Sequence, residues 1–138
     1  MSKFPKRYDV WNHSISLSLL ACETAVDLDN ASSGRIADYS STKKLAEILK
    51  NESQARYMPP CTSTVLYEAL KDYQSVQDTK RPIGADNLLV QVRLVSQELE
   101  KAEELSAERL KILTNFCVAL SRTTRDFHQE KCRRSLVA

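Results

Sequence analysis

The chain has 138 residues, of which 42% are hydrophobic and 28% charged, so it is long enough for one folded domain and too apolar for a disordered one. Its 20 basic and 18 acidic side chains give a net charge of +2, which provides no general attraction to nucleic acid or to an anionic membrane. Two glycines are too few for the tight turns of a sheet-rich fold, so composition favours an all-α protein.

Residues 1–8 form a basic start that we expect to be flexible, and residues 9–138 are expected to form a single helical domain. The basic start is not followed by the apolar run of a secretion signal. No segment approaches the roughly 20 apolar residues of a membrane span. We therefore expect no membrane insertion and a cytoplasmic location, or a nuclear one in a eukaryote.

The first predicted helix runs from Asp9 to about Asn30. Apolar residues recur along it in steps of three and four, which places them on one stripe of the helix. Such a stripe is predicted to face the core, and the cysteine within it to act as a small apolar side chain. The members of the stripe are Trp11, Ile15, Leu19, Cys22 and Val26.

Two further helices are predicted before residue 80. The first covers residues 35–55, with an interruption expected at residues 40–42, and follows a break at Ser32-Ser33-Gly34. Pro59 and Pro60 end it, because the residue before a proline is disfavoured in a helix. The next helix starts at Thr62 or Ser63 and carries an apolar face of Leu66, Leu70, Tyr73 and Val76.

The C-terminal part of the chain predicts one long helix over about residues 85–134. Neither glycine nor proline occurs between Leu88 and Phe127. Two coiled-coil-like heptad segments lie along it, separated by a gap of one heptad plus four residues, which locally unwinds a coiled coil. The first contains Leu88, Val92, Val95, Leu99 and Ala102, and the second Leu113, Cys117, Leu120, Thr124 and Phe127.

Two arrangements of this part of the chain remain open. The helix either breaks near Ser106 and folds back into a self-contained bundle, or runs unbroken and presents one half to a partner. We expect an all-α bundle of about four helices with the long helix unbroken. Its segment over residues 110–120 would anchor the core, and a protein partner or a second copy would bind the remaining seam, formed by Leu88, Val92, Val95, Leu99, Ala102 and Leu105.

Nucleic-acid binding is the alternative function. Residues 43–76 can be drawn as a helix-turn-helix, although the second helix offers Glu68, Lys71 and Asp72 rather than a basic surface. A basic cluster near the C-terminus could contact phosphates, but cations also stabilise the C-terminal end of any helix. That cluster consists of Arg122, Arg125, Lys131, Arg133 and Arg134.

The sequence contains no motif of an enzyme, such as a phosphate-binding glycine loop, a nucleophile elbow or a zinc-protease signature. His128 and Cys132 share a helix face, but two ligands do not complete a zinc site. We therefore expect no catalytic, cofactor-binding or metal-binding residues. The expected function is that of a non-catalytic adaptor, regulatory or assembly subunit.

Overall fold

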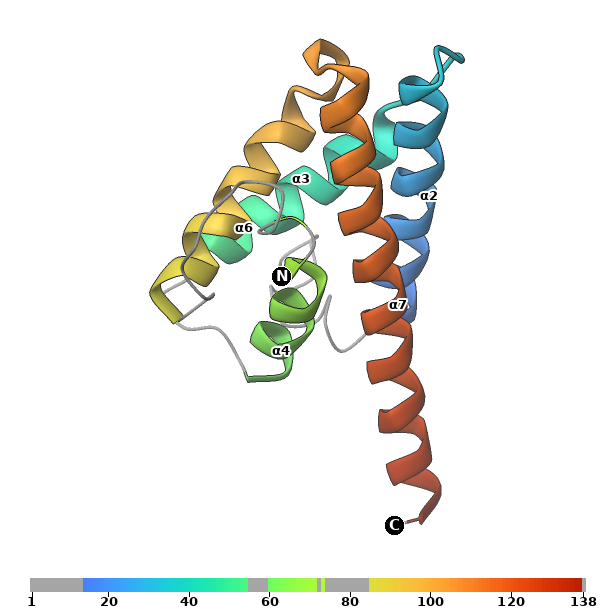
Figure 1. Cartoon of the computed structure of the whole chain (residues 1–138). Helices are drawn as coiled ribbons and strands as arrows, with labels where there is room; N and C mark the ends of the chain where they lie inside the picture. The colour runs from blue at the N-terminus through green and yellow to red at the C-terminus, as the bar shows by residue number, and fades with distance from the viewer. Residues whose placement is uncertain (1–13, 55–59, 72, 74–84, 138) are drawn as a thin grey trace, which may run out of the picture.

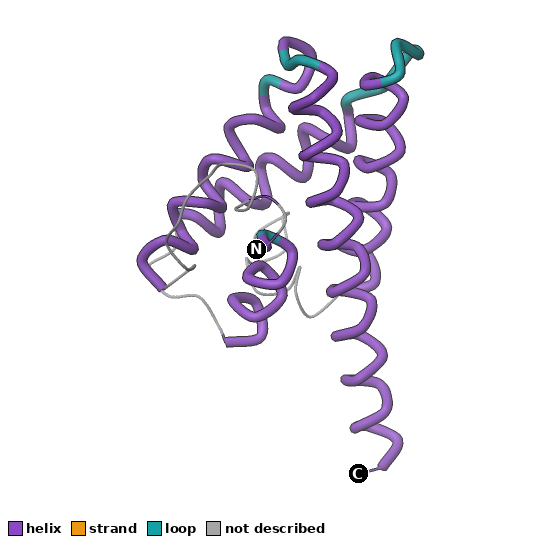
Figure 2. The backbone as a smooth tube through the Cα atoms, in the orientation of Figure 1, coloured by secondary structure: helices purple, strands orange, loops and turns teal. Residues whose placement is uncertain are grey.

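The computed structural model describes residues 14–54, 60–71, 73 and 85–137, with side chains over 16–54, 62–71, 73 and 88–130. These residues form five α-helices, a short 3₁₀ turn and no strand (Figure 2), which confirms the all-α prediction. The expected flexible start over residues 1–8 lies outside the described residues. The helices are α2 (Ser14–Ser32), α3 (Ser40–Ser53), α4 (Pro60–Ala69), α6 (Ala85–Glu100) and α7 (Ala107–Val137).

The helices pack mainly as two antiparallel pairs (Figure 1). α2 lies along α7 in the most extensive contact of the fold, and α3 lies along α6. α4 packs chiefly against α7, and the last turns of α7 extend beyond the other described helices (Figure 1). All five helices contribute to a single cluster of buried apolar side chains.

α2 buries a different face from the one that its apolar spacing predicts. Leu19 and Val26 are 59% and 55% exposed, and Cys22 is exposed as well, so the predicted burial of these three residues is wrong. Trp11 and the side chain of Ile15 lie outside the described residues. α2 instead buries a face rich in small side chains, which lets its backbone approach α7 closely. That buried face consists of Leu17, Ser18, Ala21, Thr24, Ala25 and Leu28.

The break after α2 is a glycine-terminated helix end. Gly34 has a φ of 78°, in the left-handed region that glycine adopts without steric cost. The Arg35 N–H donates to the Asn30 carbonyl at 2.8 Å and the Gly34 N–H donates to the Ala31 carbonyl at 3.1 Å. This pair of hydrogen bonds closes the helix in a Schellman motif. The predicted break at Ser32-Ser33-Gly34 is confirmed.

α3 begins five residues later than the sequence predicts. Residues 35–39 are not helical, and the Ser40 N–H donates to the Asp38 carboxylate at 3.0 Å just before the first turn. This hydrogen bond, from the backbone of Ser40, holds the pKa of Asp38 below its usual value. α3 then buries Leu45, Ala46 and Leu49.

α4 starts with Pro60 as its first helical residue, a position at which proline costs no hydrogen bond. Leu66 and Leu70 are fully buried, as is Tyr73 beyond the end of the helix, and this confirms three members of the predicted apolar face. Val76 lies outside the described residues.

The prediction of one unbroken helix over residues 85–134 is wrong. α6 ends at Glu100, a 3₁₀ turn covers Ala102–Glu104, and Leu105 is extended with a ψ of 152°. α7 then starts at Ala107, where the Ser106 hydroxyl accepts the Arg109 N–H at 3.3 Å. The reversal lets both heptad seams bury at once, whereas a continuous helix would carry them out of phase.

Two groups of polar contacts hold this reversal in place. The Glu98 carboxylate of α6 accepts hydrogen bonds from the Tyr73 hydroxyl and from the Arg109 guanidinium, whose Nε lies 2.9 Å away. At the end of α6, Lys43 donates to the Glu100 carbonyl at 3.0 Å and pairs with the Glu103 carboxylate at 2.6 Å. A cation at this position also meets the negative end of the helix dipole.

Candidate interaction surface

The first heptad seam is occupied by the chain's own helices. α6 packs mainly against α3, and the seam faces the common core. The spacing thus indicates helix–helix packing correctly, but the facing helix comes from within the chain. A partner that binds the chain in this conformation must use other residues. Of the seam, Leu88, Val92, Val95, Leu99 and Ala102 are buried, and Leu105 is partly buried against the same core.

The second seam has the same internal role. Leu113, Cys117, Leu120 and Thr124 are fully buried, and Phe127 packs against the core. α7 is thereby fixed against α2 on one side and α4 on the other. The predicted core position is confirmed for the apolar residues between 110 and 120, with the exception of Val118, which is 42% exposed.

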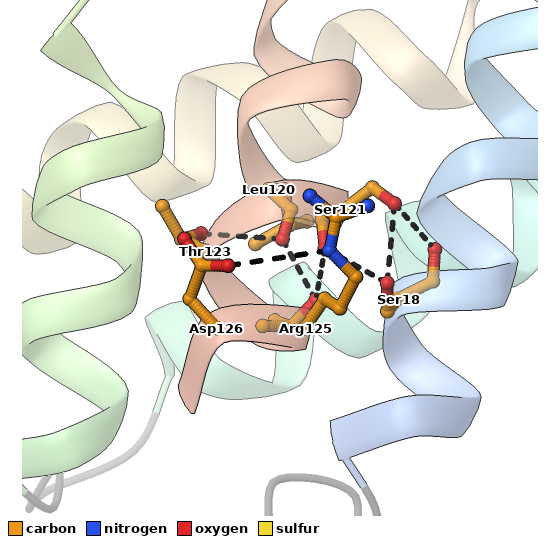
Figure 3. Close-up of polar contacts among 7 residues, drawn as sticks. Ser18, Leu120, Ser121, Thr123, Arg125 and Asp126 are labelled. Atoms are coloured by element: carbon orange, nitrogen blue, oxygen red, sulfur yellow. Dashed lines mark hydrogen bonds and ion pairs between the residues drawn. The ribbon is translucent and has the colours of Figure 1, made fainter. Parts of the chain in front are cut away.

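A pair of serines sets the register of α2 against α7. The Ser18 hydroxyl donates to the Ser121 carbonyl at 2.8 Å, and the Ser121 hydroxyl donates to the Ser18 carbonyl at 2.9 Å (Figure 3). Because the helices are antiparallel, each step up α2 from Ser18 is matched by a step back along α7 from Ser121. The exposed faces of the two helices can therefore be compared level by level.

A groove of about 370 Å³ lies between α2 and α7 on the outer side of this contact. Its apolar part comes from Val26, Val118 and the exposed Cys22, with Ala25 at its base. We call it the α2–α7 groove; it is lined by Cys22, Ala25, Val26, Asp29, Thr114, Val118, Ser121, Arg122 and Arg125.

The two ends of the groove carry opposite charges. Asp29 is exposed near the C-terminal end of α2, on the level of Leu110 in the antiparallel register. Arg122 and Arg125 are exposed at the other end, beyond Ser121. Arg122 makes no ion pair with any described side chain, and Arg125 lies 4.0 Å from Asp126, which is itself mostly exposed. These arginines are therefore available to an external carboxylate.

The two described cysteines differ in accessibility. Cys117 is fully buried in the core, and burial raises the pKa of its thiol far above the usual value. Cys22 is exposed in the groove. Of these two thiols, only Cys22 is placed to react with a reagent or to contact a bound protein.

The residues of the nucleic-acid alternative are less well arranged. α3 and α4 pack on different helices, and their described residues make little contact with each other, unlike the two helices of a helix-turn-helix. At the end of α4, the exposed Glu68 pairs with Lys71, which follows the helix, at 3.0 Å. Arg122 and Arg125 are exposed on α7. The backbone of α7 continues helical through Lys131, Arg133 and Arg134, whose side chains lie outside the described residues.

The described part of the chain brings no three cysteine, histidine or carboxylate side chains close enough to hold a metal ion. His128 is partly buried on α7, and the side chain of Cys132 lies outside the described residues. None of the described helices is both long and apolar enough to cross a lipid bilayer.

Comparison with known proteins matches this chain to no family model, no curated protein and no solved structure. The surface itself therefore provides the argument for function.

Sequence reasoning missed the groove because it assigned the larger apolar side chains of α2 to the core. The small residues Ser18, Ala21 and Ala25 also recur in steps of three and four, and they form the face that packs on α7. The signal available in the sequence was that α2 carries two stripes, one of small side chains and one of large apolar side chains.

Proposed function

We propose that this chain is a non-catalytic interaction module, of the adaptor, regulatory or assembly kind, that binds a helix of another protein molecule in the α2–α7 groove. The observation that supports the proposal is the outer stripe of α2, formed by Leu19, Cys22 and Val26, which has the spacing of a packing seam but faces outward. Amphipathic helices bind to such grooves through apolar residues three and four positions apart.

Burial of this surface would provide a useful driving force. Fully burying a leucine or valine side chain contributes roughly 1.5–3 kcal/mol. About half of that remains to be gained at Val26, which lines the groove, and at Leu19, which lies on the same stripe of α2 outside the groove lining. Val118 adds a third half-exposed apolar side chain from α7. The charged ends would fix the orientation of the bound helix, because complementary charges favour one direction over its reverse.

Site-specific photo-crosslinking tests the proposal. A benzophenone amino acid replaces Val26 in the groove, and a matched control replaces Glu47, which is exposed on α3. We expect irradiation in the cells that make the protein to yield discrete protein adducts from position 26 and none from position 47. Mass spectrometry identifies the adducts. Equal labelling at both positions, or no adduct at position 26, would contradict the proposal.

Nucleic-acid binding stays a second candidate because Arg122 and Arg125 are exposed on one face of α7. Phosphate contacts release counterions, so such binding weakens steeply as salt rises. Salt-sensitive binding of DNA or RNA that is lost in the Arg122→Glu, Arg125→Glu variant would favour this candidate over the first.

A further inference from the structure

The outer stripe of α2 is nearly symmetric about Cys22. Leu19 lies three residues before Cys22 and Val26 lies four residues after it, so the apolar side chains stand about 4.5 and 6 Å from the level of Cys22 at 1.5 Å per residue. If a second α2 lay antiparallel over this stripe, Leu19 of each chain would contact Val26 of the other, once at each end of the stripe. The central contact would then be between the two Cys22 side chains.

The charges at the two ends of the groove are also arranged about the level of Cys22. Asp29 is seven residues above Cys22, or about 10 Å. Because Ser121 faces Ser18, Arg122 and Arg125 stand level with positions 17 and 14 of α2, about 7.5 and 12 Å below Cys22. The negative end and the positive end are therefore at similar distances from one central level.

We propose that the partner that covers the α2–α7 groove is a second copy of this chain, docked about a twofold axis that crosses α2 at the level of Cys22. In this dimer α2 lies antiparallel on α2 and α7 antiparallel on α7. Asp29 of each copy faces Arg122 and Arg125 of the other. A face that is complementary to itself after a half-turn is what an isologous dimer interface requires. This inference rests on the proposed function and specifies its partner.

Charge reversal combined with sedimentation equilibrium tests the proposal. We expect the unaltered chain to be a dimer whose dissociation constant rises about tenfold or more in Asp29→Arg, and likewise in Arg122→Asp with Arg125→Asp, because each change places like charges together twice. The triple variant that carries all three changes exchanges the signs at both ends. It should recover most of the lost affinity, which neither a folding defect nor a nonspecific charge effect would produce.

Disulfide trapping at Cys22 provides an independent measurement. In a Cys61→Ser, Cys132→Ser background, mild oxidation should link Cys22 to Cys22 rapidly, since Cys117 is buried. The matched control carries Cys22→Ser and Glu47→Cys, which moves the exposed thiol to α3. We expect at least a tenfold faster formation of covalent dimer from Cys22 than from the control.

The outcomes separate this inference from the function on which it rests. A monomer at all concentrations, or a triple variant that does not recover affinity, would overturn the twofold dimer. Adducts of Val26 with other proteins in the photo-crosslinking experiment would then still support an interaction module. A monomer that also yields no adduct at position 26 would overturn both. Circular dichroism of each variant establishes that it is folded before its mass is interpreted.

Discussion

At the residue scale, Glu98 connects three separate segments of the chain. Its carboxylate accepts hydrogen bonds from Tyr73 and Arg109, and the Arg109 guanidinium lies 5.7 Å from the centre of the Tyr73 ring. Glu98 and Arg109 are each less than one third exposed. Because the pair is partly buried, removing either Glu98 or Arg109 is costly. The charge that remains is still partly shielded from water but no longer has an opposite charge beside it.

Removing the cation from this cluster should therefore destabilise the fold. We expect Arg109→Met, which retains much of the side-chain length, to lower the free energy of unfolding by about 1–3 kcal/mol. Urea denaturation followed by circular dichroism measures the change. Lys111→Met, at an exposed position on the same helix, serves as the control and should unfold close to the unaltered chain. Equal unfolding midpoints for the two variants would show that the cluster adds no stability.

At the element scale, the reversal between α6 and α7 depends on a serine rather than on glycine or proline. Ser106 precedes the first residue of α7, and its hydroxyl accepts the Arg109 N–H while its carbonyl accepts the Leu110 N–H at 3.0 Å. A serine in this position satisfies a helix N–H group that otherwise lacks a partner. Nearby like charges at Glu100 and Glu104 also weaken a continuous helix.

Loss of this cap should be measurable. We expect Ser106→Ala to lower the free energy of unfolding by roughly 1 kcal/mol, and Ser106→Thr, which keeps the hydroxyl, to lower it by less. Thermal unfolding of the three proteins in parallel provides the comparison. If threonine and alanine prove equally destabilising, the hydroxyl does not cap α7.

At the scale of the whole molecule, the five helices share one core rather than two. Phe116 of α7 is buried among residues from several helices, and its ring meets the Tyr73 ring edge-to-face with centroids 6.4 Å apart. Edge-to-face packing of this kind adds to the stabilisation from burial alone. Loss of the Phe116 side chain should consequently destabilise all five helices together.

We expect Phe116→Ala to lower stability by about 3–5 kcal/mol, a large part of the roughly 5–15 kcal/mol of a typical domain. Asn115→Ala, at the exposed neighbouring position, should change stability little. Calorimetry should show one cooperative transition that moves to lower temperature as a unit. Two separate transitions in the Phe116→Ala variant would indicate that the helices do not share a core.

The sequence predicts the internal packing better than the outer surface. Heptad spacing identifies the buried residues of α6 and α7 because each seam must meet another helix, whichever helix that is. It does not decide between an unbroken helix and one that breaks near Ser106, since the start of α7 depends on one capping hydroxyl. On α2, hydrophobicity favours Leu19 and Val26 over Ala21 and Ala25, whereas close approach to α7 favours the smaller pair. The α2–α7 groove exists because α2 packs its small side chains on α7 and leaves the large ones outside. Periodicity alone does not predict which of the two stripes is buried.

The pairing of α2 with α7 joins the earliest and latest described helices, and this has a consequence for how the chain is made. The bonded serines Ser18 and Ser121 are 103 positions apart. At about 5–20 residues per second, a ribosome needs roughly 4–15 s to pass from the end of α2 to the start of α7. During that interval both stripes of α2 are uncovered, and contacts of such high sequence separation also form slowly. Nascent chains of this protein should therefore be most dependent on chaperones until α7 has been translated.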